Sequence, residues 1–183
     1  EVINMTMDYR EFTSIKGNDI GARRLNFIIS KCQNYFSQKP INEIEVIDIG
    51  CGASPITRPI AALGFKVLGI DIDPMRIKHC NKVLATLPDL QPNLTFELKN
   101  AYDLDSKKKF DIIFIFGGVQ YIPTNLLDSL KNDGGTLITV LYDNNDVGKI
   151  HIVKKSNGKI SRTNYITAQT PVLKDFQKTR KEF

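Results

Sequence analysis

The sequence feature that most constrains the fold is a regular alternation of short apolar runs with amphipathic segments. Five runs are apolar enough to be buried strands, at residues 45–49, 66–70, 94–98, 110–116 and 136–142. Between them, residues 55–63, 74–87 and a segment around Leu126, Leu127 and Leu130 have helical spacing. Continuously apolar strands that alternate with helices indicate a parallel sheet covered on both faces. The sequence therefore predicts a doubly wound, mostly parallel α/β domain.

The pattern changes after Tyr142. A polar stretch at residues 143–148 leads to two strand-like runs, 150–153 and 159–166, which flank the hairpin signal Ser156-Asn157-Gly158. The sheet should therefore end in an antiparallel β-hairpin, and residues after Pro171 are expected to form a rim strand or coil with a charged tail.

The beginning of the chain has a different character. Apolar spacing from Asp19 to Phe36 predicts a helix, and the residues before it are polar. We divide the chain into an N-terminal lid segment and helix, residues 1–42, and an α/β domain, residues 43–183, within one globular unit.

The net charge of +5 is concentrated at the end of the chain, where residues 149–183 carry nine basic and two acidic side chains. Such a region is either a solvated surface or a site for an acidic partner such as RNA. No apolar run approaches the ~20 residues that cross a bilayer, and the start lacks the pattern of a signal peptide. We expect a cytoplasmic protein.

The cysteines and histidines do not indicate a metal or disulfide framework. Cys32, Cys51 and Cys80 include no C-x-x-C pair and are expected to be small apolar residues of the core. His79 and His151 have no neighbouring ligand residues, so no metal is expected.

The first predicted strand leads into a glycine turn. In open α/β sheets, ligands bind at the carboxyl ends of the strands, and Gly50 and Gly52 let the backbone approach one closely. Ser54 is expected to cap the next helix, with Pro55 at its first position. A dinucleotide fingerprint requires glycine where Pro55 stands, and no Walker loop is present, so neither NAD nor a nucleoside triphosphate is favoured.

The second predicted strand ends in Asp71, about 20 residues beyond the turn, where a carboxylate can accept hydrogen bonds from ribose hydroxyls. Capping is the alternative role for Asp71. Asp73 is better explained as the cap of the helix that Pro74 begins.

Together, the runs V-I-D-I-G-C-G, V-L-G-I-D-I-D-P, F-D-I-I-F and G-G-T-L-I resemble class I S-adenosylmethionine-dependent methyltransferases over roughly residues 45–142. The resemblance implies a Rossmann-like methyltransferase fold with S-adenosyl-L-methionine as cofactor. Its methionine part would lie on Asp48 to Gly52, its ribose on Asp71 and its adenine against Ile72. The cofactor-binding residues implied are Asp48, Gly50, Cys51, Gly52, Asp71, Ile72, Asn100, Ala101, Tyr102 and Phe116. Ser54 and Asn100 stand where many members have glycine and aspartate.

The loop after the fourth strand, F-G-G-V-Q-Y, would face the transferred methyl group. It lacks the [DN]-P-P-[YF] signature that resembling enzymes use on amino nitrogens, which disfavours that chemistry. Gln120 and Tyr121 are the candidate substrate contacts, or they cap and pack the next helix. No other catalytic residue is assigned.

Two regions bear on the substrate. The short connection at 143–148 and the run 122–127 are similar to protein-L-isoaspartate O-methyltransferases, but the S-x-P element of that family has no match before the first strand. Tyr9, Arg10 and Lys16 either reach an acidic group of the substrate or are solvated.

The resemblance therefore implies a methyltransferase that acts on a small-molecule or protein acceptor. Two alternatives stay open: an RNA methyltransferase that uses basic residues 149–181, and a non-catalytic methyltransferase-like partner subunit. The sequence leaves the acceptor atom and the oligomeric state open.

Overall fold

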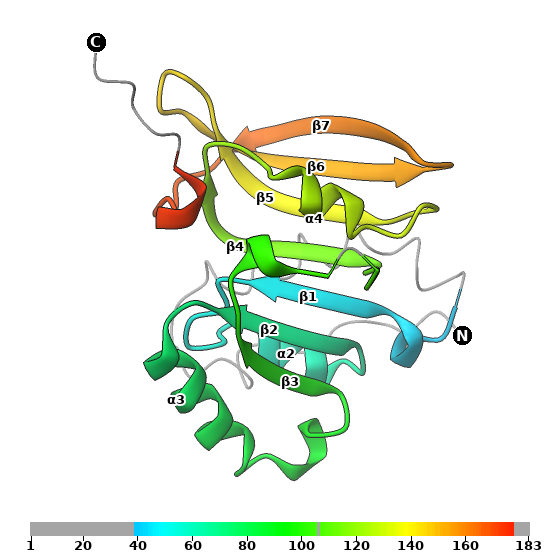
Figure 1. Cartoon of the computed structure of the whole chain (residues 1–183), viewed down its shortest axis with the longest axis vertical. Helices are drawn as coiled ribbons and strands as arrows, with labels where there is room; N and C mark the ends of the chain where they lie inside the picture. Colours follow the sequence, from blue (N-terminus) through cyan, green and yellow to red (C-terminus); the bar gives the residue numbers. More distant parts are fainter. Residues whose placement is uncertain (1–38, 106, 178–183) are drawn as a thin grey trace.

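The computed structural model describes residues 39–105 and 107–177 (Figure 1). Seven strands form one sheet in the order β3-β2-β1-β4-β5-β6-β7. Strands β1 to β5 are parallel, and β6 and β7 are antiparallel, so the predicted α/β sheet with a terminal hairpin is confirmed. The strands are β1 (Glu45–Ile49), β2 (Lys66–Asp71), β3 (Leu94–Leu98), β4 (Ile112–Val119), β5 (Thr136–Tyr142), β6 (Gly148–Ser156) and β7 (Lys159–Thr167).

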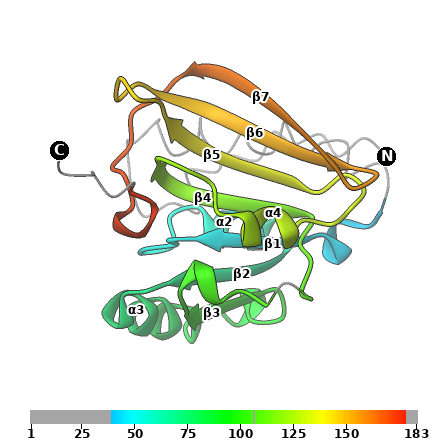
Figure 2. The ribbon, with the colours of Figure 1, turned by 45° about the horizontal axis from the view of Figure 1, so that its top comes forward.

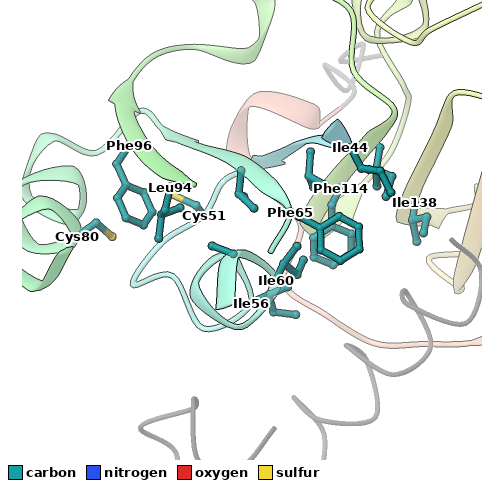
Figure 3. Packing of buried hydrophobic residues seen from close by; sticks show 14 of the residues in the cluster. Ile44, Cys51, Ile56, Ile60, Phe65, Cys80, Leu94, Phe96, Phe114 and Ile138 are labelled. Atoms are coloured by element: carbon teal, nitrogen blue, oxygen red, sulfur yellow. The ribbon is translucent and has the colours of Figure 1, made fainter. Parts of the chain in front are cut away.

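Helices cover both faces of the sheet (Figure 2). The α-helices are α2 (Thr57–Ala62), α3 (Pro74–Leu84) and α4 (Thr124–Asp128), and the short 3₁₀ helices are η2 (Ile41–Glu43), η3 (Pro88–Leu90), η4 (Ala101–Asp103) and η5 (Lys174–Phe176). One apolar cluster joins α2 and α3 to the sheet, and Figure 3 shows Ile60, Phe65 and Phe114 within it. The second cluster includes Leu126 and Leu130 on the opposite face.

The N-terminal expectations lie outside the described residues. These are the helix at 19–36 and the lid residues Tyr9, Arg10 and Lys16, together with Cys32. The division at residue 42 therefore stays a prediction.

The start of α2 differs from the sequence-based expectation. The helix begins at Thr57, and Ile56 precedes it without a side-chain cap, so Ser54 is not the cap and Pro55 is not the first helical residue. Ser54 instead continues the turn, because its N–H donates to the Cys51 carbonyl at 2.8 Å and its φ is 61°. The prediction for Asp73 is confirmed, since its side chain accepts the N–H groups of Met75 and Arg76.

The fourth strand extends beyond its predicted end at Phe116 to Val119. Its register against β5 shifts between Phe114 and Gly118, and Gly118 forms a parallel bridge with Val172. The extra length comes from renewed pairing with β5 after this shift, at Gly118 with Val140 and Val119 with Leu141, and the chain after β7 returns to the same strand end.

The opposite, amino-terminal edge of the sheet is held by a buried carboxylate. Asp111 is 3% exposed and accepts Lys39 Nζ at 2.6 Å, Lys131 Nζ at 2.8 Å and the Glu45 N–H at 2.8 Å. Burial alone would raise the pKa of Asp111, but these bonds hold it below its ordinary value. This network connects the start of β1, the residue before β4 and the segment between α4 and β5.

Candidate functional site

A cavity of about 300 Å³ lies at the carboxyl ends of β1 and β2. Its wall is built from these strand ends, the start of α3, η4 and residues 172–176. Of the cofactor residues expected from the sequence, Gly50, Asp71, Ile72 and Ala101 line the cavity. The remaining ones, Asp48, Cys51, Gly52, Asn100, Tyr102 and Phe116, are not part of its wall.

The glycine turn has the positive φ angles that its two glycines predict, and the same conformation recurs at Ser54. Gly50, Gly52 and Ser54 all have positive φ, at 70°, 56° and 61°. The third of these angles is costly for any residue except glycine, by roughly 1–2 kcal/mol. Ser54 is also buried. The turn thus keeps the shape of a three-glycine loop although its third position is serine.

The turn is fixed to the second strand. The N–H groups of Gly50 and Cys51 both donate to the Ile70 carbonyl, at 2.9 and 3.0 Å. Asp71 accepts the Gly52 N–H on Oδ2 and the Asp73 N–H on Oδ1, each at 2.9 Å. Asp71 therefore fixes the glycine turn, whereas the helix cap is Asp73; the ribose role of Asp71 stays a prediction. Because a carboxylate has about four acceptor positions, two stay available toward the cavity.

Asp48 carries the clearest sign of an unmet interaction. It is 1% exposed, its Oδ2 accepts the Thr57 hydroxyl at 2.5 Å, and its Oδ1 has no partner among the described residues. Burial, with a smaller contribution from Asp71, raises the pKa of Asp48 to about 7. A buried acceptor without a donor costs about 1–3 kcal/mol. A donor or cation supplied by a ligand would offset that cost.

Two thiols lie beneath the turn (Figure 3). Cys51 and Cys80 are both buried in the apolar cluster, and Cys80 Sγ donates to the Gly52 carbonyl at 3.2 Å. The hydrogen bond between the two thiols, followed by burial, raises the pKa of Cys51, and the same bond lowers the pKa of Cys80 to about 7. Cys51 therefore packs the floor of the turn and does not face the cavity.

Of the residues expected around an adenine ring, some line the cavity and others do not. Ile72 lines the cavity and is 50% exposed, so its apolar surface is available to pack against a ligand. The Asn100 side chain accepts the Tyr102 N–H at 3.0 Å and so caps η4. Phe116 is half-buried and packs against Phe114 in the core cluster, with ring centroids 6.1 Å apart. Phe116 therefore packs on the core cluster and does not line the cavity.

Residues 172–176 were missed by sequence reasoning. These residues were expected to form rim or coil, yet all five line the cavity. The available signal was the spacing of Val172, Leu173 and Phe176, which are apolar residues within a charged tail. Gln120 and Tyr121, the candidate substrate contacts, both bind this segment: the Gln120 N–H donates to the Phe176 carbonyl at 2.9 Å, and the Tyr121 hydroxyl to that of Asp175 at 3.3 Å.

The basic side chains of the C-terminal region that fall within residues 149–177 do not gather at the cavity. Lys154 pairs with Thr136, the first residue of β5, and Lys155 and Lys159 follow at the hairpin turn, so all three lie at the amino-terminal edge. Among the described basic residues after Lys149, Lys174 lines the cavity.

Two features are absent from residues 39–105 and 107–177. No helix there has the length and hydropathy required to cross a membrane. No group of three or more histidine, cysteine, aspartate or glutamate side chains is arranged to hold a metal ion in that part of the chain.

The sequence of residues 46–133 matches the family described as "Methyltransferase domain". A curated relative, the ubiquinone biosynthesis O-methyltransferase of Rickettsia akari (strain Hartford), is 26% identical over 124 residues, which are 64% of this chain and 48% of the relative. The enzyme of the same name from Pelagibacter ubique (strain HTCC1062) is 33% identical over 86 residues, which are 47% of this chain and 35% of the relative. The chain thus spans about half the length of the first of these relatives.

Solved structures show the same fold. A putative protein-L-isoaspartate O-methyltransferase from Plasmodium falciparum, in complex with S-adenosyl-L-homocysteine, has a TM-score of 0.63 at 19% identity, covering 79% of this chain and 71% of that one. A second protein-L-isoaspartate O-methyltransferase has a TM-score of 0.67 at 14% identity, covering 80% of this chain and 46% of that one. The similarity noticed in the C-terminal connection is thus found in the overall fold as well.

Proposed function

Because residues 46–133 match the methyltransferase domain family and the chain has the fold of S-adenosylmethionine-dependent methyltransferases, we propose that this protein transfers a methyl group to an oxygen of a small-molecule or protein acceptor. The observation that carries the proposal is the cavity between the positive-φ turn at Gly50 and the Asp71 carboxylate. A nucleoside with a cationic tail fits these two carboxylates and the turn, because its ribose hydroxyls can donate to Asp71 and its positive charge lies toward Asp48.

The residues present fit the cofactor at both of its ends. Asp71 retains acceptor positions for ribose hydroxyls. Asp48 lies outside the cavity wall, but its buried Oδ1, which has no partner among the described residues, would accept a hydrogen bond from an ammonium group that reaches it behind the turn. Ile72 and Ala101 offer apolar surface to an adenine ring. Asn100 is retained as a proposed neighbour of that ring, although its side-chain oxygen already caps η4.

S-adenosylmethionine, when bound, supplies a methyl group that is already activated on a sulfonium. The protein therefore has to position the acceptor in line with that group and exclude water, and proximity of this kind is worth up to ~7–11 kcal/mol. Leu173 serves the second requirement, because it is an apolar side chain that contacts both the Gly50 turn and the end of β4. A base is needed only for an acceptor that arrives protonated.

Two observations favour oxygen as the acceptor atom. The loop after β4 has no [DN]-P-P-[YF] run, and the two curated relatives quoted above are named as O-methyltransferases. An RNA acceptor receives less support, because Lys154, Lys155 and Lys159 lie at the edge of the sheet opposite the cavity.

Calorimetric titration of the protein with S-adenosylmethionine, S-adenosylhomocysteine and NAD tests the cofactor. We expect the first two to bind and NAD not to bind; the opposite pattern contradicts the proposal. A labelled-methyl screen over metabolite, protein and RNA pools then tests the acceptor. Label in metabolites or protein supports the proposal, label in RNA favours the RNA alternative, and binding without any transfer favours a non-catalytic partner subunit.

A further inference from the structure

Residues 171–176, which we call the C-terminal strap, are fastened to the end of β4 by backbone hydrogen bonds. The Gly118 N–H donates to the Pro171 carbonyl at 2.8 Å, and the Leu173 N–H donates to the Gly118 carbonyl at 2.9 Å. The Gln120 N–H then donates to the Phe176 carbonyl at 2.9 Å. The strap thus runs beside the strand end at which the sheet meets the cavity, and Figure 1 shows η5 (red) at that edge.

The strap forms one side of the cavity. Its last five residues are all in the cavity wall, together with Gly50 and Asp71. Leu173 is its most closely fitted member, since a Cβ on Gly50 would lie 3.1 Å from Leu173 Cδ1 and a Cβ on Gly117 only 2.6 Å from Leu173 Cγ. At about 300 Å³, the cavity is at the lower end of the size range for small-molecule sites. Any change in the strap's position therefore changes the space open to a ligand.

An aromatic cluster holds the far end of the strap. Phe176 is 2% exposed, and its ring lies 5.9 Å from that of Tyr102, in a stacked arrangement, and 6.5 Å from that of Tyr121. Tyr102 follows β3 and Tyr121 follows β4, so the strap joins two loops that sequence separates. The cluster brings together the expected adenine side and the expected acceptor side of the site.

The two tyrosine hydroxyls meet at one carbonyl of the strap. The oxygen of Asp175 lies 2.8 Å from the Tyr102 hydroxyl and 3.3 Å from the Tyr121 hydroxyl, and the two hydroxyls also contact each other. Because each hydroxyl has one proton, the pair makes two of these three hydrogen bonds at a time: the bond of Tyr102 to Asp175 is the shorter one, and Tyr121 donates either to the Tyr102 oxygen or to Asp175. Burial and the bond to Tyr121 raise the pKa of the Tyr102 phenol, so it remains a protonated donor. Packing alone would not require both hydroxyls to converge on a backbone acceptor.

We propose that Tyr102 and Tyr121 are positioning residues of the cofactor pocket, which hold the strap closed over a bound adenosyl ligand through the Asp175 carbonyl. This inference rests on the proposed function. Neither hydroxyl lines the cavity, so each acts through the strap and not by touching the ligand. When the strap is held, Leu173 and Phe176 keep the pocket narrow and slow the departure of the ligand.

The test compares Tyr102→Phe, Tyr121→Phe and the double variant, which keep the rings and remove only the hydroxyls. In stopped-flow measurements, we expect S-adenosylhomocysteine to dissociate about three- to tenfold faster from the double variant than from the unaltered protein. A change of this size corresponds to the loss of one or two ordinary hydrogen bonds. The single variants should be non-additive, because both hydroxyls serve one acceptor. Additive effects, or unchanged dissociation, would overturn the proposal.

Tyr142→Phe is the matched control. The Tyr142 hydroxyl also donates to a backbone carbonyl of the C-terminal region, that of Thr170 at 2.7 Å, but this residue precedes the strap. We expect its ligand dissociation to be unchanged. An equal acceleration in Tyr142→Phe would show that any loosening of the C-terminal region suffices, and the assignment to Tyr102 and Tyr121 would fail.

Amide hydrogen exchange in the ligand-free protein separates failure of this inference from failure of the proposed function. The Leu173 and Phe176 N–H groups are hydrogen-bonded, and both should exchange faster in the double variant. Unchanged exchange overturns the inference even if the cofactor binds. If the unaltered protein binds neither S-adenosylmethionine nor S-adenosylhomocysteine, the proposed function fails together with the positioning role, whatever the exchange shows.

Discussion

The Asp71 carboxylate accepts the backbone N–H of Gly52 at 2.9 Å, across 19 residues of sequence. This bond joins the end of β2 to the glycine turn after β1. The residue expected to bind a ribose is therefore also the residue that fixes the shape of the loop expected to bind the rest of the cofactor.

Replacing Asp71 should weaken cofactor binding strongly. In Asp71→Asn, the amide cannot accept from both Gly52 and Asp73, and the charge toward the ribose is lost. We expect a loss on the order of 1.5–3 kcal/mol in S-adenosylmethionine binding, about ten- to 150-fold, by calorimetry. Asp89→Asn, an exposed carboxylate in η3, is the control and should bind normally. Unchanged affinity in Asp71→Asn would restrict this residue to capping.

Cofactor affinity should depend on pH through Asp48. Its pKa is about 7 in the free protein, and a cationic ligand favours the ionised form, so binding should strengthen as pH rises toward 7. Between pH 5.5 and 7.5 we expect roughly a tenfold gain, below the α-amino pKa of about 7.7–8.0, so that the ligand stays cationic. Asp48→Asn should bind more weakly with a flat profile. A profile of equal slope in Asp48→Asn would exclude Asp48 as the titrating group.

Ser54 is predicted to carry backbone strain. Ser54→Gly and Ser54→Ala both remove the hydroxyl, but only alanine retains the cost of a φ of 61°. In urea unfolding, the glycine variant should therefore be the more stable of the two by about 1 kcal/mol. The reverse order would mean that the turn relaxes at this position. If both variants bind S-adenosylmethionine as the unaltered protein does, the hydroxyl does not contact the cofactor.

Lys131 should stabilise the folded protein through its ion pair with the buried carboxylate of Asp111. In Lys131→Met, one cation 2.8 Å from Asp111 Oδ2 is lost, and we expect the free energy of unfolding at pH 7 to fall by about 1–3 kcal/mol. A carboxyl whose pKa is lowered by folding stabilises above its unfolded pKa and loses that effect as pH falls through its folded value. The difference should therefore shrink toward pH 3. Lys107→Met, at an exposed lysine, should change stability little at either pH.

Gly117 should be needed because Leu173 occupies the space beside it. A Cβ at residue 117 would lie 2.6 Å from Leu173 Cγ, so Gly117→Ala should destabilise the fold by about 1–3 kcal/mol. Leu173→Ala removes the obstructing atoms, and the double variant should be more stable than the two single effects predict. Simple additivity in thermal unfolding would show that the clash is relieved elsewhere.

Much of the fold was predictable because it follows local rules. Strands β1, β3 and β5 were predicted at their observed bounds, since buried parallel strands are continuous apolar runs. The cap at Asp73 followed from its place before Pro74. The start of α2 was wrong by two residues, because a serine can cap a helix or continue a turn, and only the Cys51 contact decides between them.

The candidate site divides in the same way. The sequence alone determined the sheet, the glycine turn and the acidic residue after β2, because hydrophobic period, glycine and proline act over a few residues. The tertiary structure decided that Asp48 Oδ1 is buried without a partner among the described residues and that residues 172–176 return to line the cavity. Those features depend on desolvation and on contacts between distant segments, such as Tyr102 with Asp175, which no local pattern encodes.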